Sequence, residues 1–302
     1  MASPFTTYPA TDRRQTGASI SRPVDRSVLA CPVCRGMNWK PGPSVRGVAL
    51  SLCAGCGLLG TTHFVAKSRT THYLYDVEAE DLAAYREQYL QQRLALYTRF
   101  LPALPPFRQT GKLLEVGSGY GYFLEMADAA GWRSEGVEIS PYCCQVARQP
   151  GCKVWQAQLE DVDLVPESYD VVILWDVVEH FTEPDAVVRR CGSLLRPGGA
   201  LVMRTPDARG LDSTFQPMRA AYRHLVYPAN TAEHVFHFKP RDLATLVADS
   251  GFEVRSTNCE QRWRERVISG NNSFVRAVRW FIMRYAHWCE WPYEFVLTAV
   301  KK

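Results

Sequence analysis

The spacing of hydrophobic and polar residues changes along the chain in a way that predicts alternating strands and helices. Residues 169–176 are almost continuously apolar, which is typical of a strand buried on both faces of a parallel sheet. Shorter strands are expected at 112–114, 134–139 and 153–156, and helices are expected after the first two. This alternation runs from about residue 112 to 256 and predicts a parallel sheet with helices on both faces.

Three other segments extend the pattern. Residues 76–101 carry apolar side chains at helical spacing and end at Pro102, so we expect a helix before the first strand. Residues 195–205 have the form of a helix end, a glycine turn and another strand. Residues 274–288 place aromatic side chains on one helical face and basic side chains on the other. Such a stripe packs on the sheet or on a partner subunit, or meets a membrane surface.

Composition limits the classes of protein to which the chain can belong. A chain of 302 residues, 46% of them hydrophobic, is large enough for one sizeable domain and a smaller one. The formal net charge of +4 does not demand a polyanionic partner, and no apolar run reaches the roughly 18 residues of a membrane span. Residues 1–27 are rich in Ser, Thr, Pro and Arg without an apolar core. We therefore expect a disordered tail rather than a secretory signal, and a cytoplasmic protein.

A glycine-rich segment follows the first predicted strand of the sheet. Its glycines are Gly117, Gly119 and Gly121, and glycine lets the backbone bend tightly and a ligand approach closely. Glu115 stands two residues before the first of these glycines, and Glu138 ends the next predicted strand 19 residues after Gly119. A ribose-binding carboxylate is expected at roughly that distance in nucleotide-binding folds. A strand, a glycine turn and a helix in this order predict a site for a nucleotide-type cofactor.

The acid before the glycines completes the pattern E-x-G-x-G-x-G, which resembles the first motif of class I S-adenosylmethionine (SAM) methyltransferases. The resemblance covers residues 112–302 and continues with Glu138, with Trp-Asp-Val-Val-Glu-His ending at His180, and with Leu-Arg-Pro-Gly-Gly ending at Gly199. It implies an α/β fold with a Rossmann-like, seven-stranded, mostly parallel sheet and helices on both faces. Residues 293–300 look like the last strand of that fold, which is antiparallel.

The resemblance implies that SAM is bound, and S-adenosylhomocysteine released, outside the carboxyl ends of the strands. The candidate cofactor-binding residues share that position, and they are Glu115, Gly117, Ser118, Gly119, Gly121, Glu138, Ile139, Gln158, Leu159 and Trp175. The family often has an acid where Gln158 stands, to meet the adenine amino group. An amide carbonyl can accept the same hydrogen bond, and Glu160 or Asp161 are the alternatives.

Two pairs of cysteines lie near the start of the chain. Cys31 and Cys34 form one C-x-x-C pair, Cys53 and Cys56 form the other, and 18 residues separate the pairs. This spacing is typical of a structural zinc site with four thiolate ligands. Two disulfides are the alternative, but no secretion signal is expected and the other six cysteines show no framework. The pattern therefore predicts a small zinc-ribbon-like module that holds a structural Zn²⁺.

These observations divide the chain into segments. They are a disordered tail at 1–27, a zinc-binding module at 28–66, a helical linker and cofactor cover at 67–108, and a methyltransferase domain at 109–302 with a lid at 206–239 and a helical insertion at 260–290. The lid is long for a loop and carries many aromatic residues and three of the seven histidines, so we expect it to bind the methyl acceptor. Its candidate acceptor-binding residues are Tyr222, Tyr227 and His237.

Methyl transfer to an oxygen or a carbon can require a base, and histidine suits neutral pH. His180 follows Glu179 just past the strand at 169–176, and His234 follows Glu233 in the lid. Zinc-bearing sugar C-methyltransferases resemble this chain in the cysteine pairs and in a Glu-His pair of the lid, where the histidine is the base. They also carry a further C-terminal domain with no counterpart here. The resemblance implies catalytic roles for His234 and Glu233, with His180 as the competing base, and packing histidines are the alternative for both.

The expected function is SAM-dependent methyl transfer to a small-molecule acceptor, which is a sugar, a nucleotide sugar or a secondary metabolite, on oxygen or carbon. The alternative is an RNA base methyltransferase that docks through the zinc module. The modest net charge argues against a nucleic-acid partner, because nucleic-acid binders usually show a basic stripe. A non-catalytic scaffold is the third hypothesis, and the intact glycine turn with both acids argues against it. The sequence does not specify the acceptor or the oligomeric state.

Overall fold

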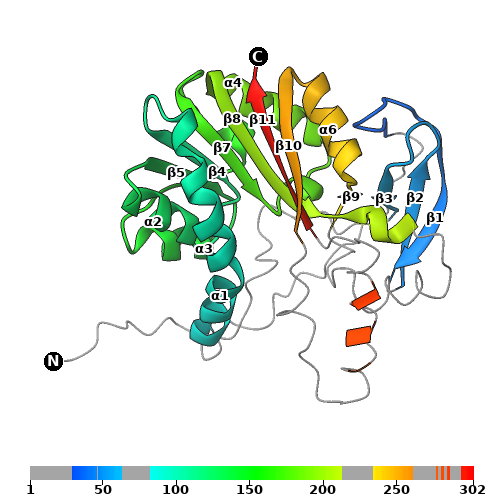
Figure 1. Cartoon of the computed structure of the whole chain (residues 1–302), viewed down its shortest axis with the longest axis horizontal. Helices are drawn as coiled ribbons and strands as arrows, with labels where there is room; N and C mark the ends of the chain where they lie inside the picture. Colours follow the sequence, from blue (N-terminus) through cyan, green and yellow to red (C-terminus); the bar gives the residue numbers. More distant parts are fainter. Residues whose placement is uncertain are drawn as a thin grey trace, which may run out of the picture.

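Two sheets that lie side by side form the framework of the protein (Figure 1). The computed structural model describes residues 29–45, 47–62, 82–212, 234–260, 277, 280–281, 284–285 and 294–302. One sheet has seven strands in the order β10-β11-β8-β7-β4-β5-β6, and the other has four in the order β1-β2-β3-β9. The predicted tail lies outside the described residues, as do most of the predicted lid and insertion.

The seven-stranded sheet confirms the predicted mostly parallel α/β arrangement. Its strands are β4 (Lys112–Val116), β5 (Arg133–Glu138), β6 (Lys153–Gln156), β7 (Tyr169–Trp175), β8 (Leu195–Pro206), β10 (Phe252–Glu260) and β11 (Glu294–Lys301). The ladders from β6 through β5, β4 and β7 to β8 are parallel, whereas β11 pairs antiparallel with β8 and β10. Every residue of β7 is buried, as expected for a central strand covered on both faces.

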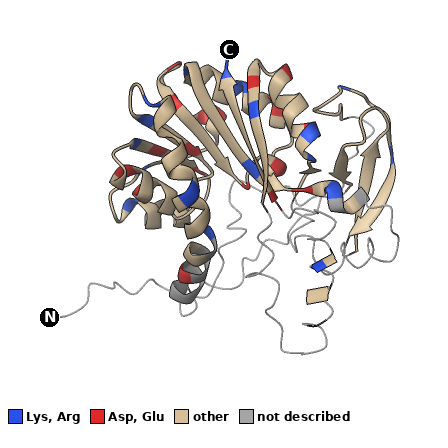
Figure 2. Cartoon of the chain, in the orientation of Figure 1, with Lys and Arg blue, Asp and Glu red and all other residues tan. Residues whose placement is uncertain are grey.

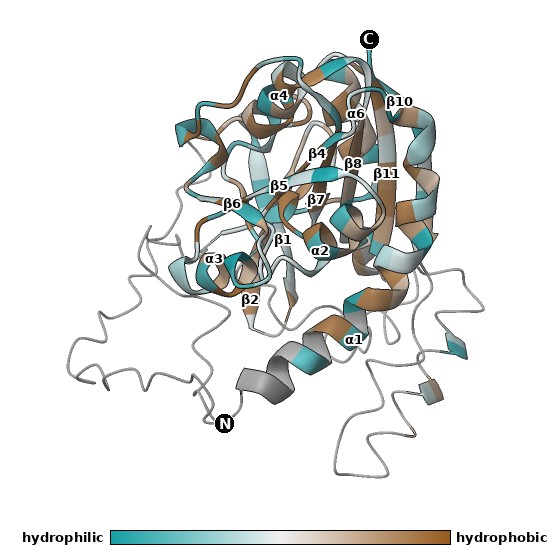
Figure 3. Ribbon diagram, turned by 90° about the vertical axis from the view of Figure 1, so that its left-hand side faces the viewer, coloured by the Kyte–Doolittle hydropathy of each residue, from teal (hydrophilic) through white to brown (hydrophobic). Residues whose placement is uncertain are grey.

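Helices cover both faces of this sheet. They are α1 (Leu82–Phe100), α2 (Tyr122–Ala129), α3 (Pro141–Arg148), α4 (Pro184–Leu194) and α6 (Pro240–Asp249). The helix expected after the strand at 134–139 is confirmed as α3, at whose start the Ser140 hydroxyl accepts a hydrogen bond from the Cys143 amide and Pro141 occupies the first helical position. Figure 3 shows the apolar strands inside and the polar helix faces outside. The carboxyl ends of the parallel strands therefore remain as the edge at which a ligand can bind.

The four-stranded sheet joins the start of the chain to its second half. It contains β1 (Trp39–Val45), β2 (Val48–Cys53), β3 (Leu59–Thr61) and β9 (Phe236–His237). β9 belongs to the segment predicted as the lid, and it pairs antiparallel with β3. Buried cysteines and Leu58 of the N-terminal module lie in the same hydrophobic cluster as α4 and α6. The two parts of the protein therefore share one core, which the sequence pattern did not predict.

The predicted amphipathic helix at 274–288 is described only at a few positions. Residues 277, 280–281 and 284–285 are helical. Trp280 and Phe281 are more than half exposed, so neither side chain is packed on the sheet. Among the described residues, no helix combines the length and the apolar character needed to cross a bilayer.

Candidate active site and metal centre

The glycine bend lies between β4 and α2. Gly117, Gly119 and Gly121 have φ angles of 73°, 53° and 79°, in the left-handed region that side chains with a Cβ disfavour. A Cβ on Gly117 would lie 2.5 Å from Val177 Cγ2, in the segment that follows β7. The bend therefore needs glycine for its conformation and, at Gly117, for close packing as well.

Glu138 links the bend to the next strand. One oxygen of its carboxylate accepts a hydrogen bond from the Gly119 amide at 2.8 Å, and the other accepts one from the Ser140 amide at 2.8 Å. The side chain is buried at the carboxyl end of β5. A carboxylate has about four lone-pair sites, so two backbone contacts leave capacity for ligand hydroxyls. Glu138 therefore holds the bend in shape and remains a candidate for ribose binding.

Glu115 is a buried acid at the same edge of the sheet. It is 2% exposed, and its Oε2 atom has no hydrogen-bond partner among the residues that the structure describes. Burial raises the pKa of this carboxyl well above its usual range; the Arg93 guanidinium opposes the shift and the nearby Glu138 adds to it. An orphaned buried carboxylate oxygen is costly, and a cationic ligand would satisfy it. This edge of the sheet thus fits a cofactor that carries an ammonium or a sulfonium group.

The other predicted cofactor residues differ in how they can reach a ligand. Ile139 is 42% exposed just after β5, and Gln158 is half-buried. Leu159 is buried in the core, so it can offer only its backbone. The Ser118 hydroxyl lies against Gly136 of β5. A Cβ added at Gly136 would be only 2.5 Å from the hydroxyl oxygen.

Trp175 packs into the core at the end of β7. Its ring centroid lies 5.5 Å from that of Phe100 and 5.6 Å from that of Phe123. The indole, which is predicted to lie at the cofactor, packs against α1 and α2. Asp176, which follows it at a φ of 55°, points its carboxylate to two guanidinium groups. They belong to Arg93 at 2.6 Å and Arg204 at 2.5 Å.

This buried charge cluster is the main feature that the sequence reasoning missed. Arg204 also pairs with Glu294, so α1, β7, β8 and β11 meet at one group of charges. The available signal was Arg204 itself, because a charged residue that directly follows the apolar run at 200–203 must find a partner when it is buried. The cluster fixes α1 against the carboxyl edge of the sheet.

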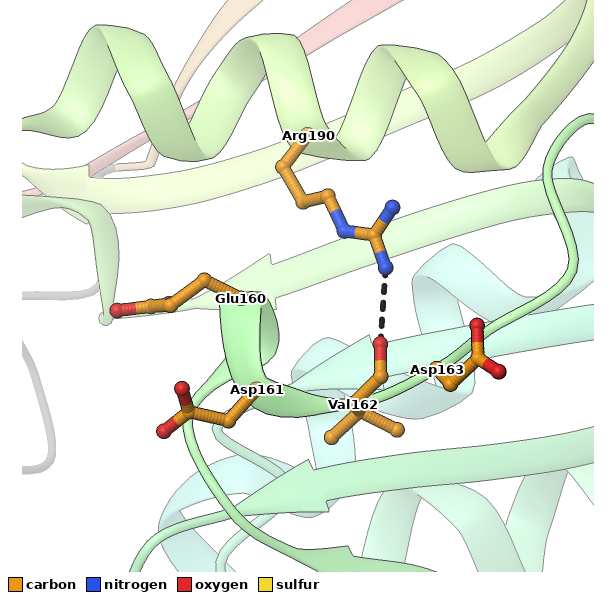
Figure 4. Close-up of a pocket in the computed structure, with 5 residues that line it drawn as sticks. All are labelled: Glu160, Asp161, Val162, Asp163 and Arg190. Atoms are coloured by element: carbon orange, nitrogen blue, oxygen red, sulfur yellow. Dashed lines mark hydrogen bonds between the residues drawn. The ribbon is translucent and has the colours of Figure 1, made fainter.

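A separate hollow lies beside the turn after β6 (Figure 4). Its lining residues are Glu160, Asp161, Val162, Asp163 and Arg190. Arg190 of α4 lines one side of it and donates a hydrogen bond to the Val162 carbonyl at 2.9 Å. Glu160 and Asp161, the alternatives for the adenine contact, line this acidic hollow.

The segment after β7 and the segment before β9 bring together three potential proton acceptors. The Glu179 carboxylate and the imidazoles of His180 and His234 place their ligand atoms within 4.8 Å of one another. The two rings meet edge to face, with centroids 4.8 Å apart. Burial, and then the charge of Asp176, raises the pKa of Glu179 to about 8. Such a group can exchange a proton with an acceptor, and it could also hold a cation.

His237 extends this group toward the N-terminal module. Its ring lies 5.8 Å from that of His234, and its Nε2 atom lies 3.0 Å from the Thr61 hydroxyl oxygen. The structure thus brings His180, His234 and His237 into one row. The other residues predicted for the acceptor and the base, Tyr222, Tyr227 and Glu233, lie outside the described residues.

The four predicted zinc ligands converge at one point. The Sγ atoms of Cys31 and Cys56 are 3.5 Å apart, those of Cys34 and Cys53 are 3.4 Å apart, and all four lie within 4.8 Å of one another. A tetrahedral zinc site with bonds of about 2.3 Å separates its sulfurs by about 3.8 Å, so only a small expansion is needed. None of the four is in a disulfide. The residues present therefore fit a Zn²⁺ ion.

The two C-x-x-C turns have the same backbone pattern. The amide of Arg35 donates to the Cys31 carbonyl, and the amide of Gly57 donates to the Cys53 carbonyl, both at 2.9 Å. Burial opposes the ionisation of Cys53, but hydrogen bonds to its sulfur from backbone N–H groups and from the neighbouring thiols outweigh burial and lower its pKa to about 7, whereas burial raises the pKa values of Cys31 and Cys56. A thiol that ionises near neutral pH is suited to bind a metal.

A methyltransferase-domain family profile matches residues 84–257, which is more than half of the chain. The chain therefore belongs to this methyltransferase family, and it is a SAM-dependent methyltransferase. It is 27% identical over 164 residues to the ubiquinone biosynthesis O-methyltransferase of Xanthomonas euvesicatoria pv. vesicatoria, across 51% of this chain and 69% of the relative. The enzyme of the same name from Bordetella avium is 28% identical over 175 residues, which cover 55% of this chain and 73% of that relative.

Solved structures share the fold. A chain from the complex of the Haloferax volcanii Trm112 methyltransferase activator with a methyltransferase superposes with a TM-score of 0.55 at 15% identity, across 73% of this chain and 94% of that one. A geranyl diphosphate methyltransferase, solved in complex with GPP and sinefungin, gives a TM-score of 0.52 at 17% identity. The match covers 68% of this chain and 77% of that one. At these identities the similarity shows the fold alone.

The state of Glu115 leads to a prediction about cofactor binding. Its pKa is raised in the free protein, and a cationic cofactor favours the carboxylate, so SAM binding should release a proton. Affinity should therefore rise with pH until the raised pKa is passed. Titration calorimetry in buffers of different ionisation enthalpy measures this release.

The Glu115→Gln variant should lose the proton release and bind SAM about tenfold more weakly or worse. Glu125→Gln is the matched control, because Glu125 is exposed in the first turn of α2. Equal proton release by Glu115→Gln and the wild type would remove Glu115 from the cofactor site.

Proposed function

We propose that the protein methylates a small-molecule acceptor at the carboxyl edge of the seven-stranded sheet, with His234 as the base. The observation that carries this proposal is the group formed beyond the end of β7 by the buried Glu179 and His234 and the half-buried His180. Bound SAM supplies an electrophilic methyl group. The remaining requirement is removal of the acceptor proton, and the histidines lie where an acceptor held over the strand ends would present it.

Each of the proposed cofactor residues would contact a different part of SAM. The orphaned Glu115 oxygen would meet the positive charge of the methionine part, and Glu138 would bind the ribose hydroxyls while it holds Gly119. Exposed Ile139 would cover the adenine, and Gln158 would accept a hydrogen bond from its amino group. Alignment by these groups is the larger part of the catalysis, because the cofactor brings its own reactivity.

His234 is preferred over His180 as the base because of its surroundings. It is 2% exposed and lies between the other two imidazoles, so its neighbours and its backbone are fixed. Glu179 lies within reach of both His180 and His234, and in its ionised form it can stabilise an imidazolium once the proton has been taken. We propose that His234 receives the proton and that His180 supports it.

The proposed acceptor is a sugar, a nucleotide sugar or a secondary metabolite. Support comes from the ubiquinone O-methyltransferases, whose name describes methylation of a small molecule on oxygen. Figure 2 shows basic and acidic residues interspersed along the described elements, which gives no support to a basic stripe for RNA there. The N-terminal module shares its core with α4 and α6, which supports a structural role for its proposed Zn²⁺.

Transfer of a labelled methyl group from SAM tests the acceptor class. The reactions should contain either phenolic and sugar-nucleotide pools or total RNA. We expect label in the small-molecule fraction, unaffected by moderate salt, and background label in RNA. Label in RNA that falls steeply as salt rises would favour the alternative of an RNA methyltransferase.

A further inference from the structure

Thr61 is the residue through which the N-terminal module touches the histidine group. It is the last residue of β3 and is fully buried. Its amide donates to the Val235 carbonyl at 3.0 Å, and its hydroxyl donates to the His234 carbonyl at 2.6 Å. The same hydroxyl oxygen lies 3.0 Å from His237 Nε2. One threonine from the start of the chain thus contacts three residues near the proposed base.

The hydroxyl has only one proton, and this fixes the direction of the third contact. Because the Thr61 proton is donated to the His234 carbonyl, the oxygen can only accept from the His237 ring. His237 Nε2 must therefore carry a proton. In the neutral ring this leaves Nδ1 unprotonated, so the threonine selects one of the two imidazole tautomers.

The backbone of the same segment is held from its other side. The Val235 amide donates to the Glu179 carbonyl at 2.8 Å, while the Val235 carbonyl accepts from Thr61. The segment that carries His234 and His237 is therefore held at Val235 between the N-terminal module and the turn after β7. Without the N-terminal module, the Val235 carbonyl would lose its hydrogen bond from the Thr61 amide.

We propose that Thr61 is a positioning residue, which sets the tautomer of His237 and holds the backbone of His234 in the proposed active site. The expected effect on turnover rests on the proposed function. The tautomer of His237 and the backbone contacts of Val235 follow from the hydrogen bonds alone. In this account the metal-binding module completes the active site from the opposite end of the chain, and it acts through a hydroxyl group rather than through the metal.

The tautomer can be measured on the unmodified protein. Long-range ¹H–¹⁵N correlation spectra, recorded where imidazole is neutral, should show His237 protonated at Nε2. Thr61→Val should change this pattern, and Thr61→Ser should keep it because the hydroxyl remains. A His237 ring protonated at Nδ1 in the wild type would overturn the proposal, whether or not any variant folds.

Kinetics test the consequence for the reaction. Thr61→Val should lower kcat about tenfold or more while KM for SAM stays the same, since small misplacements of a catalytic group are costly. Thr61→Ser should restore most of the loss. The control is Thr62→Val: its hydroxyl donates to the Ala49 carbonyl at 2.8 Å on the exposed face of the same module. It should leave both the spectra and kcat unchanged.

Removal of the metal provides a second test of the coupling. The wild type should contain one zinc per chain, and Cys53→Ser should lose it together with the Nε2–H signal of His237. Retention of that signal in a metal-free variant would contradict the claim that the folded module holds His237. If His234→Gln leaves turnover intact, His234 is not the base and the proposed function is wrong in that respect. The NMR spectra of His237 would still test the role of Thr61, because they do not depend on turnover.

Discussion

Replacing His234 with glutamine should lower kcat by about 10²- to 10⁴-fold, the range that a positioned base contributes. The affinity for SAM should stay the same, because the structure places His234 beside Glu179 and His180 rather than at the glycine bend. Glutamine keeps a polar side chain of similar length, so the buried site is not left with a void. Single-turnover methyl transfer and cofactor titration measure the two quantities separately.

His180→Gln is the comparison that assigns the base. We expect a smaller loss, below about tenfold, if His180 only supports the imidazolium of His234. Unchanged turnover in His234→Gln together with a large loss in His180→Gln would reverse the two roles. Turnover that is lost in a chelator and regained with Mg²⁺ or Mn²⁺ would make the three residues ligands of a cation instead.

Replacing Gly117 with alanine should abolish SAM binding at any practical concentration. The new Cβ would lie 2.5 Å from Val177 Cγ2 and 3.2 Å from its Cγ1, at a φ of +73° that already disfavours a side chain. The left-handed conformation costs roughly 1–2 kcal/mol and overpacking costs typically another 1–3 kcal/mol. The strain would fall on the bend and on the segment that leads to Glu179 and His180, so both binding and turnover should suffer.

Gly251→Ala is the matched control for this variant. Gly251 has a φ of +94°, and no neighbouring atom lies within 4 Å of the place that a Cβ would take, so alanine there meets the conformational cost without the clash. It should melt a few degrees lower than the wild type and bind SAM normally. Equal SAM affinity of Gly117→Ala and Gly251→Ala would show that the close packing at the bend does not matter for the cofactor.

The parts of this fold that could be predicted from the sequence are those fixed by local chemistry. Gly117 and Glu138 lie at the carboxyl ends of the two strands of one strand–helix–strand unit, and their spacing along the chain reflects the geometry of that unit. The same holds for the two C-x-x-C turns, whose sulfurs converge once the small sheet forms. Short repeating distances of this kind leave a clear signal in a single sequence.

Long-range pairing left no such signal. β9 has two residues, so it shows no alternation, and it joins β3 from more than 170 positions away. The group of Arg93, Asp176, Arg204 and Glu294 draws on four separate elements, and only the charge inside β8 hinted at it. Trp175 ends an apolar strand, and its packing against Phe100 and Phe123 depends on where α1 lies.

The most direct measurement is a crystal structure of the protein with S-adenosylhomocysteine bound. The account predicts the adenosine at the bend of residues 117–121, its ribose hydroxyls on Glu138, and its sulfur turned toward His180 and His234. A homocysteine sulfur that faces away from the histidines, or a cofactor held in the acidic hollow of Glu160 and Asp161, would contradict it.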